Sequence, residues 1–412
     1  MEKKGIKILV LTYWAYQEAL VQTYTLPYLK IMAENKSLSI WLVCLQPKGK
    51  TIDAAELEAI QSALASFRIR LVLLDYKPLS LAGLVNTGLI VLKLLIFTIK
   101  YKIDVIHAWS TPAGALGYVI AKTLSRRLVI DSYEPHAEAM IENGTWKKGG
   151  VPFRFLFWLE KKQTHYASSV IAATEGMREY ARLKYGKNFT TNFFVKAACV
   201  DFNKFNIKNR DKEFRQSLDL TNKIVAVYAG KFGGIYLDTD FFRWVKIAVG
   251  HWGDKFRLLL LTNHSKQEIL NYCKQFDIPS GAIYQKFVSH EQVPRYMGLA
   301  DFAVTPVKPV PSKRYCTPIK DGEYWAMGLP IIIPDGISDD SDIIRKEEIG
   351  YVFKRLNEEE YLYSIIAIEK LISDSEVEQR ITRVAEKYRS FEIARSVYQR
   401  VYLADGTMCM RS

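Results

Sequence analysis

The chain has 412 residues, which is enough for two domains that each bury a core of their own. Its apolar content of 49% and its charged content of 25% are those of a folded globular protein and exclude a disordered chain. The net charge of +13 favours anionic partners: nucleic acid, an anionic membrane surface or a phosphorylated ligand. Because no zinc-finger, RRM-like or helix-turn-helix pattern accompanies this charge, we expect no nucleic-acid partner.

The cysteines and the N-terminus indicate the compartment. Five cysteines are widely spaced, and no pair of them has the spacing of metal ligands, which favours free thiols in a reducing environment. The first residues lead directly into the apolar run Ile6–Leu11. We therefore expect no signal peptide and a cytoplasmic protein, at the inner face of the cytoplasmic membrane if it binds lipid.

The first half of the chain alternates short apolar runs with longer helix-compatible segments. The runs are Ile6–Leu11, Ile40–Leu45, Ile69–Leu74, Ile103–His107, Leu128–Ile130 and Ser169–Ala172. This alternation predicts a parallel sheet with helices on both faces. Ligands of such sheets bind beyond the carboxyl ends of the strands, so Tyr13–Gln22, His107–Thr111 and Asp131–Glu138 are the candidate site segments.

The second half starts with another strand-like run, Lys223–Ala229, followed by Gly230, Lys231, Gly233 and Gly234. Glycines after a strand let backbone N–H groups approach a phosphate closely, and the lysine adds positive charge. The sequence alone leaves open whether this segment binds phosphate or is only a tight turn between a strand and a helix.

A short helix is predicted between two buried strands, Ala300–Pro306 and Leu329–Pro334. Thr317 is the candidate N-cap, Pro318 suits the first helical position and Gly328 suits the end of the helix. The N-terminus of such a helix presents N–H groups and a positive dipole to an anion such as a pyrophosphate.

Glu323 lies one turn inside this helix, where its carboxylate can accept hydrogen bonds from the two hydroxyls of a ribose. Pro318–Pro330 has the pattern P-x-K-x-x-E-Y-x-A-x-G-x-P, which closely resembles the donor-binding helix of the retaining GT-B glycosyltransferases of family four. The segments Tyr16–Gln22, Asp104–Trp109 and Val195–Phe205 resemble earlier parts of that family in the same order. Tyr388 to Phe391 resembles its C-terminal segment.

The resemblance implies an α/β protein of the GT-B class, with two Rossmann-like domains facing a central cleft. Residues 1–205 are then expected to bind the acceptor and residues 206–385 the nucleotide sugar. Residues 386–412 are expected to form a helix that crosses back to the first domain.

The same resemblance implies the roles of individual residues. The catalytic candidates are His136 and Lys231. The donor-binding candidates are Gly230, Gly233, Gly234, Tyr315, Thr317, Ile319, Lys320 and Glu323. The acceptor-side candidates are Gln17, Glu18, Gln22, Trp109 and Glu138.

Two positions differ from the family pattern. Tyr315 stands where the family has the first of two glutamates, and no second basic residue follows Lys231, so Lys320 or Arg314 is a candidate substitute. For His136 a structural role stays open, and His107 fits packing better than chemistry.

Asp238 and Asp240 form an Asp-x-Asp pair, which binds a metal and the diphosphate in the other glycosyltransferase fold. Here the pair follows a glycine loop and precedes a helix-like segment, which favours a role at a helix start. Because no further oxygen ligands are evident, we expect no metal site.

Two segments suit either packing or a membrane surface. Leu79–Ile99 is apolar except for Lys93 and a few small polar residues, but its uncharged part is shorter than the roughly 20 residues of a membrane span. It fits a buried helix or a shallow membrane insertion. Trp146–Lys162 mixes aromatic and basic residues, which suits an anionic leaflet or a solvated basic helix face.

The sequence therefore predicts a metal-independent hexosyltransferase that moves a sugar from a UDP- or GDP-linked donor to a glycan or lipid-linked acceptor. Surface polysaccharide or glycoconjugate synthesis is the expected setting, and the nucleotide sugar is a co-substrate with no other cofactor. Two alternatives remain: a nucleotide-sugar epimerase and a catalytically silent homologue that binds a partner.

Overall fold

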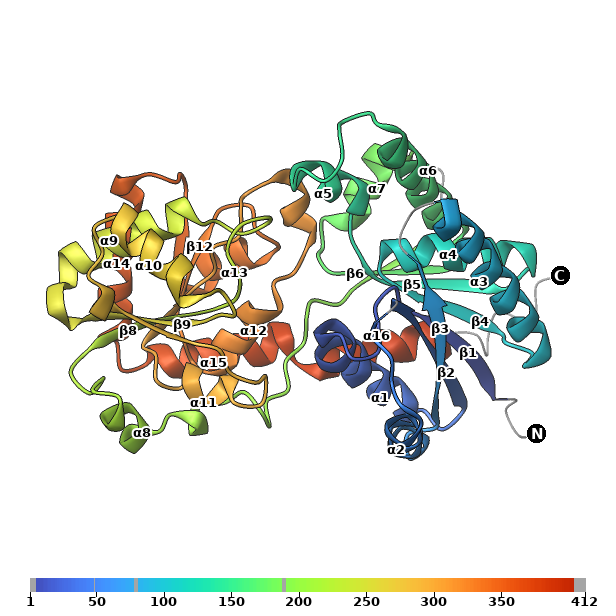
Figure 1. Ribbon diagram of the computed structural model, residues 1–412, viewed down its shortest axis with the longest axis horizontal. Coiled ribbons are helices and arrows are strands. Elements are labelled where there is room, and N and C mark those ends of the chain that lie inside the picture. Colours follow the sequence, from blue (N-terminus) through green and yellow to red (C-terminus); the bar gives the residue numbers. More distant parts are fainter. Residues whose placement is uncertain (1–4, 48, 78–80, 187–189, 404–412) are drawn as a thin grey trace. The chain divides into compact units, whose positions relative to one another are not determined.

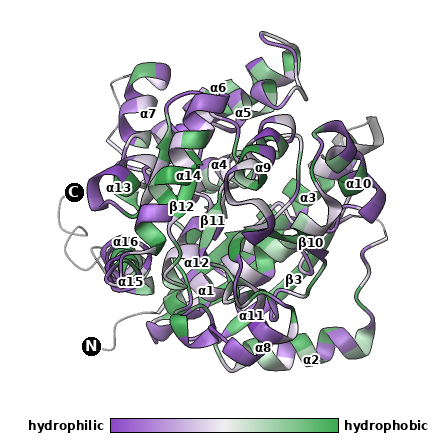
Figure 2. Cartoon of the chain, turned by 90° about the vertical axis from the view of Figure 1, so that its left-hand side faces the viewer, coloured by the Kyte–Doolittle hydropathy of each residue, from purple (hydrophilic) through white to green (hydrophobic). Residues whose placement is uncertain are grey.

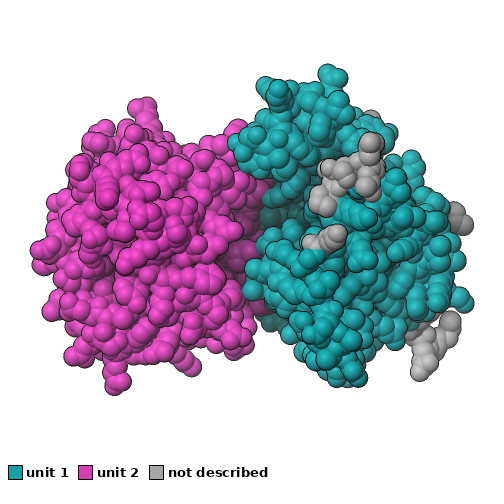
Figure 3. All heavy atoms as spheres, viewed as in Figure 1, with its two compact units in different colours: residues 1–196, 392–412 teal, residues 197–391 magenta. Residues whose placement is uncertain are grey.

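A computed structural model describes residues 5–47, 49–77, 81–186 and 190–403. The chain forms two compact units, one of residues 1–196 with 392–412 and one of residues 197–391 (Figure 3). The first two residues of the apolar segment considered for membrane insertion, 79 and 80, lie outside the described residues.

The boundaries of the units differ from the expected 205/206 and 385/386. The structure divides the chain after Lys196 and returns it to the first unit at Glu392. The physical reason is that Val200 and Phe205 belong to the hydrophobic core of the second unit. The Val200 N–H also donates to the carbonyl of Arg389 in that unit, at 2.8 Å.

The first unit contains a seven-stranded parallel sheet in the order β3-β2-β1-β4-β5-β6-β7 (Figure 1). Its strands are β1 (Ile6–Leu11), β2 (Leu38–Pro47), β3 (Ile69–Tyr76), β4 (Val105–Trp109), β5 (Arg127–Tyr133), β6 (Ser169–Ala172) and β7 (Asn192–Val195). The central strands are almost wholly buried, as expected for a parallel sheet with both faces covered. All six runs predicted in this half are strands, and β7 is an additional one at the edge.

The helices of the first unit lie on both faces of its sheet (Figure 1). They are α1 (Leu26–Glu34), α2 (Ala54–Ala65), α3 (Leu81–Lys100), α4 (Thr111–Thr123), α5 (His136–Glu142), α6 (Val151–Tyr166), α7 (Met177–Tyr185) and α16 (Phe391–Leu403), with a π-helix at Leu20–Thr25. Strand order and connections put α1 and α2 on one face and α3, α4 and α6 on the other, because parallel crossovers are right-handed.

The second unit contains a six-stranded parallel sheet in the order β10-β9-β8-β11-β12-β13. Its strands are β8 (Ile224–Ala229), β9 (Phe256–Leu261), β10 (Ile283–Lys286), β11 (Phe302–Val304), β12 (Ile331–Pro334) and β13 (Gly350–Phe353). The helices are α8 (Lys212–Ser217), α9 (Thr239–Trp252), α10 (Lys266–Gln275), α11 (Val293–Met297), α12 (Ile319–Ala326), α13 (Asp340–Glu347), α14 (Glu358–Ile372) and α15 (Val377–Arg389). Short 3₁₀ turns occur at Ile207–Asn209, Gly253–Lys255, Ser280–Ala282 and Pro311–Tyr315.

The core of the second unit consists of two apolar clusters. Alternate residues of β8 take part in different clusters, Val225 and Val227 in one and Ala226 and Tyr228 in the other. Because successive side chains of a strand point to opposite faces, the two clusters lie on the two sides of the sheet. In Figure 2 the strands are largely green, whereas the helices carry both green and purple residues. The chain is thus a two-domain Rossmann-like α/β protein, as the sequence predicts.

Candidate functional site

The predicted donor residues lie at the carboxyl ends of adjacent strands in the second unit. β8 and β11 pair with each other, and β12 pairs with β11 on its far side. From β8 the chain builds β9 and β10 on one side and then starts β11 on the other. The point between β8 and β11 is therefore a topological switch point, where open α/β sheets bind their ligands.

The glycine loop after β8 has a backbone that requires glycine. A Cβ at Gly230 would lie 2.5 Å from the Tyr228 hydroxyl, which is closer than real contacts allow. Gly233 and Gly234 have φ angles of +74° and +60°, in the left-handed region that glycine adopts without strain. The Lys231 side chain is exposed. The backbone carbonyl of Lys231 accepts a hydrogen bond of 2.6 Å from the Tyr228 hydroxyl.

Helix α12 begins one residue later than the sequence predicts. Pro318, and not Thr317, occupies the N-cap position, with extended backbone and no side-chain cap. The predicted N-cap is therefore wrong, and the Thr317 hydroxyl lies instead 3.3 Å from that of Ser338. The first-turn N–H groups of α12 consequently carry no side-chain cap, which leaves this end suited to an anion.

The end of α12 follows the prediction. Gly328 has a φ of +69°, and its N–H donates to the carbonyl of Trp325 at 2.9 Å. The N–H of Leu329 donates to the carbonyl of Tyr324 at 3.0 Å. These two hydrogen bonds form a Schellman motif, which satisfies the last carbonyls of the helix.

Tyr324 joins α12 to the strand that leads into the glycine loop. Its ring is fully buried, and its hydroxyl accepts a hydrogen bond of 3.0 Å from the N–H of Ala229. Burial raises the pKa of the Tyr324 hydroxyl, so it stays neutral. This contact places Glu323, the preceding residue, on an element fixed to the start of the glycine loop.

A buried charge cluster that the sequence analysis did not identify supports the first turn of α12. Asp321 is fully buried and accepts a hydrogen bond of 2.6 Å from the Thr305 hydroxyl. Asp340, which pairs with the buried Arg389, lies close to it. Burial, together with the neighbouring Asp340 carboxylate, raises the pKa of Asp321 well above its usual range. One guanidinium thus lies beside two buried carboxyl groups, and burial raises the pKa of both.

The Glu323 side chain is 11% exposed and faces His290. The distance between Glu323 Oε1 and His290 Nε2 is 3.7 Å. Lys204 Nζ donates to the other ring nitrogen of His290, Nδ1, at 2.7 Å. Because a protonated lysine only donates, Nδ1 accepts and the proton of the neutral ring is on Nε2, toward Glu323. His290 and Lys204 are site residues that sequence reasoning missed.

The remaining donor-side candidates lie in the first turn of α12 or just before it. Ile319 and Lys320 form its first turn and are half-buried, and Tyr315 ends the preceding 3₁₀ turn. Arg314, considered as a substitute cation, pairs instead with Asp342 at 2.6 Å. Its charge is therefore partly compensated by a carboxylate of α13.

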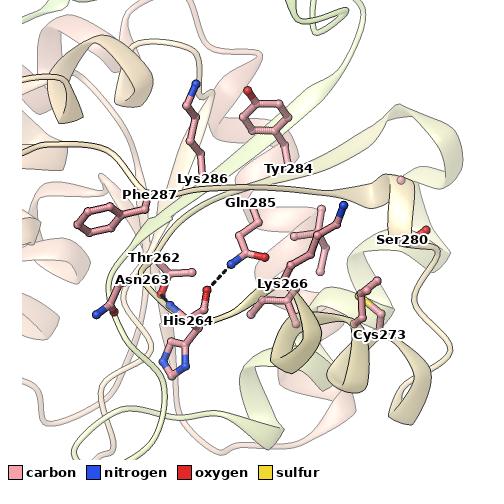
Figure 4. Close-up of a pocket in the computed structure, with 14 residues that line it drawn as sticks. Thr262, Asn263, His264, Lys266, Cys273, Ser280, Tyr284, Gln285, Lys286 and Phe287 are labelled. Atoms are coloured by element: carbon pink, nitrogen blue, oxygen red, sulfur yellow. Dashed lines mark hydrogen bonds between the residues drawn. The ribbon is translucent and has the colours of Figure 1, made fainter.

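A pocket of about 910 Å³ lies beside this region (Figure 4). It is lined by the loop after β9, by α10 and by β10 with its flanking residues, and none of the predicted donor residues lines it. His264 connects it to the glycine loop, since its Nε2 accepts a hydrogen bond of 2.9 Å from the N–H of Phe232. Gln285 donates to the His264 carbonyl at 2.6 Å, as the dashed line shows.

His136, the catalytic candidate of the first unit, is the first residue of α5, beyond the end of β5. Its side chain is 30% exposed, and its Nδ1 lies 3.4 Å from Glu134 Oε1. The neighbouring N–H of Ala137 donates to Glu160 at 2.8 Å. Burial raises the pKa of Glu160 to about 8. Glu160 is a further residue that sequence reasoning missed.

The polar acceptor-side candidates already have partners within the first unit. Gln17 accepts a hydrogen bond from Gln46 at 3.1 Å, and Glu18 pairs with Lys50. Gln22 donates to the carbonyl of Tyr16 at 2.6 Å.

Glu138 accepts from the Tyr180 hydroxyl at 2.7 Å and from Lys184 at 3.0 Å. Trp109 is fully buried, so its ring offers no surface to an acceptor in this structure.

Trp109 belongs instead to a buried cage around Lys196. The Lys196 ammonium lies 3.6 Å from the ring centroid of Tyr28 and 3.2 Å from the Asp131 carboxylate. Burial acts against ionisation of Asp131, but the Lys196 charge, the nearby His107 ring and a hydrogen bond from the Tyr398 hydroxyl hold its pKa at about 2. The expected packing role of His107 is confirmed, since its ring is fully buried.

The Asp-x-Asp pair is part of a helix start, as the sequence favours. Asp238 is the N-cap of α9 and accepts from the N–H of Thr239 at 2.6 Å. Asp240 accepts from the Tyr361 hydroxyl at 3.1 Å. Among the described residues, no three His, Cys, Asp or Glu side chains are grouped as metal ligands.

Neither a protein-family model nor a curated protein sequence matches this chain. Solved structures match it over nearly its full length. Sucrose-phosphate synthase of Thermosynechococcus elongatus has a TM-score of 0.72 at 14% identity, covering 97% of this chain and 100% of the other. HepE of Anabaena in complex with UDP-glucose has a TM-score of 0.69 at 13% identity, covering 97% and 100%.

WaaG, a glycosyltransferase involved in lipopolysaccharide biosynthesis, has a TM-score of 0.68 at 10% identity, covering 96% of this chain and 100% of the other. At such low identity these matches establish the architecture and leave the chemistry to the site residues. The two-domain Rossmann-like fold of this chain is that of GT-B proteins.

Proposed function

We propose that this protein is a retaining, metal-independent glycosyltransferase that transfers a hexose from a UDP- or GDP-linked donor to a glycan or lipid-linked acceptor. The observation that carries the proposal is the nearly buried Glu323 carboxylate on a helix fixed to the glycine loop at a topological switch point. The nucleotide sugar is a co-substrate, and no other cofactor is needed.

The geometry of the second unit suits a nucleoside diphosphate. The first-turn N–H groups of α12, the glycine loop and Lys231 supply positive charge for the diphosphate. In this proposal the Glu323 carboxylate accepts hydrogen bonds from the ribose hydroxyls. Charge that develops on the departing diphosphate would be stabilised by the same groups, which is how such a site lowers a barrier without a protein nucleophile.

His136 and Tyr315 are proposed to contact the sugar. His136 is half-buried at the start of α5 and keeps a ring edge accessible. Tyr315, which replaces a carboxylate in the resembled motif, offers a hydroxyl in place of a charge. We expect this replacement to alter sugar preference and to leave nucleotide binding unchanged.

The acceptor is proposed to bind the first unit, at the loops after β1 and β5 that contain Gln17, Glu18 and Gln22 on one side and Glu138 on the other. The complex of HepE with UDP-glucose supports a UDP-linked donor. The role of WaaG in lipopolysaccharide biosynthesis supports a lipid-linked glycan at the inner face of the cytoplasmic membrane.

Turnover of nucleotide sugars tests the proposal. The protein is incubated with a panel of UDP- and GDP-sugars, with water alone, with mixed oligosaccharides and with a membrane lipid extract, and released nucleotide and sugar products are measured. We expect nucleotide release that increases with one acceptor class. A changed nucleotide sugar without acceptor would identify an epimerase, and nucleotide binding without any turnover would identify a silent homologue.

A substitution at Lys231 tests whether turnover takes place at the proposed site. Replacing Lys231 with alanine is expected to lower kcat by about 100-fold, because a cation that stabilises the departing diphosphate is lost. Lys255→Ala is the matched control, since Lys255 is also exposed and lies in the turn after α9. Equal activity of the two variants would remove Lys231 from the mechanism.

A further inference from the structure

Helix α3 has two apolar faces, and within the described residues only one of them is buried against the rest of the protein. Ile90, Leu94 and Thr98 are buried on one face. The exposed side chains on the opposite face are Val85, Leu89, Leu92, Ile96 and Ile99, each between 52% and 67% exposed. At 3.6 residues per turn these five form one continuous stripe along the helix. A soluble helix normally has a polar outer face, so this stripe requires a partner.

A second exposed stripe occurs on α6. Val151 is 80%, Phe155 61% and Trp158 49% exposed, at helical spacing. Phe155 and Trp158 stack on each other, and Lys162 Nζ lies 5.9 Å from the centre of the Trp158 ring. Aromatic rings beside lysines are typical of the water–lipid interface, where the rings enter the headgroup layer and the charges stay outside.

Both helices contact α4, so the two stripes belong to one helical layer on the same face of the first sheet (Figure 1). This layer, α3, α4 and α6, is named the three-helix face. Half of the eighteen exposed large apolar side chains in the described residues lie on it: five on α3, three on α6 and Val119 on α4.

The charge of the three-helix face has a single sign. Neither α3 nor α4 contains an acidic residue, and the one acidic residue of α6, Glu160, is fully buried. The exposed cations on these helices are Lys93, Lys100, Lys122, Arg154, Lys161 and Lys162. Lys147 and Lys148, just before α6, add two more.

The geometry points to the three-helix face as the surface with which this protein lies on an anionic phospholipid membrane. The apolar stripes would enter the headgroup region, and the lysines would contact lipid phosphates. No helix in the described part of the chain has the length and apolar content to cross a bilayer, so the contact is peripheral.

Charge favours lipid over a second copy of the chain. The spacing of the α3 stripe also fits a two-helix seam, in which identical faces meet. Such a seam would bring Lys93 and Lys100 of two copies together, and the face has no exposed carboxylate to compensate them. An anionic leaflet supplies that compensation.

Co-sedimentation of the full chain with vesicles tests this inference. We expect binding to vesicles that contain phosphatidylglycerol at low salt and binding at least about tenfold weaker to pure phosphatidylcholine. The double variant L92S/I96S is expected to weaken partition into anionic vesicles about tenfold or more, because two apolar side chains no longer enter the lipid. No binding of the wild-type chain to anionic vesicles at low salt would overturn the inference.

The matched control is L362S/I366S on α14, which has the same spacing and similar side chains that are 39% and 36% exposed. It should bind vesicles as the wild type does, and an equal loss in both double variants would overturn the inference. The inference would also be overturned if the wild-type chain formed a dimer that did not bind vesicles and if the L92S/I96S variant were monomeric. The inference is independent of the proposed transfer reaction, and UDP and GDP binding by the same variants separates a failure of one from a failure of the other.

Discussion

Glu323 is positioned by groups that are distant from it in the sequence. His290 lies 3.7 Å from its carboxylate, and Lys204 donates to the far nitrogen of that histidine. His290 is itself 42% exposed, so its contribution is to orient the carboxylate and not to bury it. A carboxylate held in one direction loses less entropy when it binds a ligand, which makes His290 a positioning residue.

Replacing His290 with alanine is therefore expected to weaken UDP or GDP binding about fivefold, corresponding to about 1 kcal/mol. Isothermal titration calorimetry measures this effect. His251→Ala is the matched control, because His251 also faces a glutamate, Glu369 at 3.4 Å, in the same unit and on α9. If His290→Ala and His251→Ala bind nucleotide with the same affinity, the positioning role is wrong.

Helix α12 shows which structural features follow from local sequence. Its end was predicted because Gly328 alone allows the left-handed turn that the Schellman motif needs. Its start was misplaced because Thr317 and Pro318 suit two neighbouring cap positions equally well, and the choice depends on packing. Asp340 and Arg389, which lie close to Asp321 in the first turn of α12, are far from it in the sequence. No local sequence pattern therefore predicts these contacts.

The buried side chain of Glu160 joins helices α5 and α6, and its pKa is raised. Glu160 of α6 accepts from the Ala137 N–H of α5 and from the Tyr185 hydroxyl, at 2.8 and 3.0 Å. Burial raises its pKa from an ordinary 4.5 to about 8. Between these values the folded chain keeps a proton that the unfolded chain releases, so the free energy of unfolding falls as pH rises.

Glu160→Gln keeps a neutral group of the same shape and removes this titration. We expect the urea concentration at the unfolding midpoint to decrease between pH 5 and pH 8, and to decrease more for the wild type than for the variant. The difference in unfolding free energy should be on the order of a few kcal/mol. Glu179→Gln on α7, an exposed position, is the control and should follow the wild type. Parallel pH profiles of wild type and Glu160→Gln would show that Glu160 is ionised in the folded protein.

At the scale of the whole molecule the two-domain architecture followed from the sequence, because buried parallel strands are short apolar runs. Strands β7, β9, β10 and β13 were not among the predicted runs, and β7 and β10 are half-buried edge strands with polar residues. The apolar segments near Leu79–Ile99 and Trp146–Lys162 were recognised, but only the fold shows that α3 and α6 belong to one helical layer. Sequence patterns identify faces of single helices, whereas a surface composed of several helices depends on the topology.

The central claim is that the second unit binds a nucleoside diphosphate through α12 and Glu323. Calorimetric titration of the full chain with UDP and GDP tests it most directly, using wild type, Glu323→Ala and the exposed control Glu386→Ala. We expect wild type and control to bind one of the two nucleotides equally, and Glu323→Ala to bind it about 10- to 100-fold more weakly, because charge-assisted hydrogen bonds are lost. Absence of binding to both nucleotides, or equal affinity of Glu323→Ala and wild type, would contradict the claim.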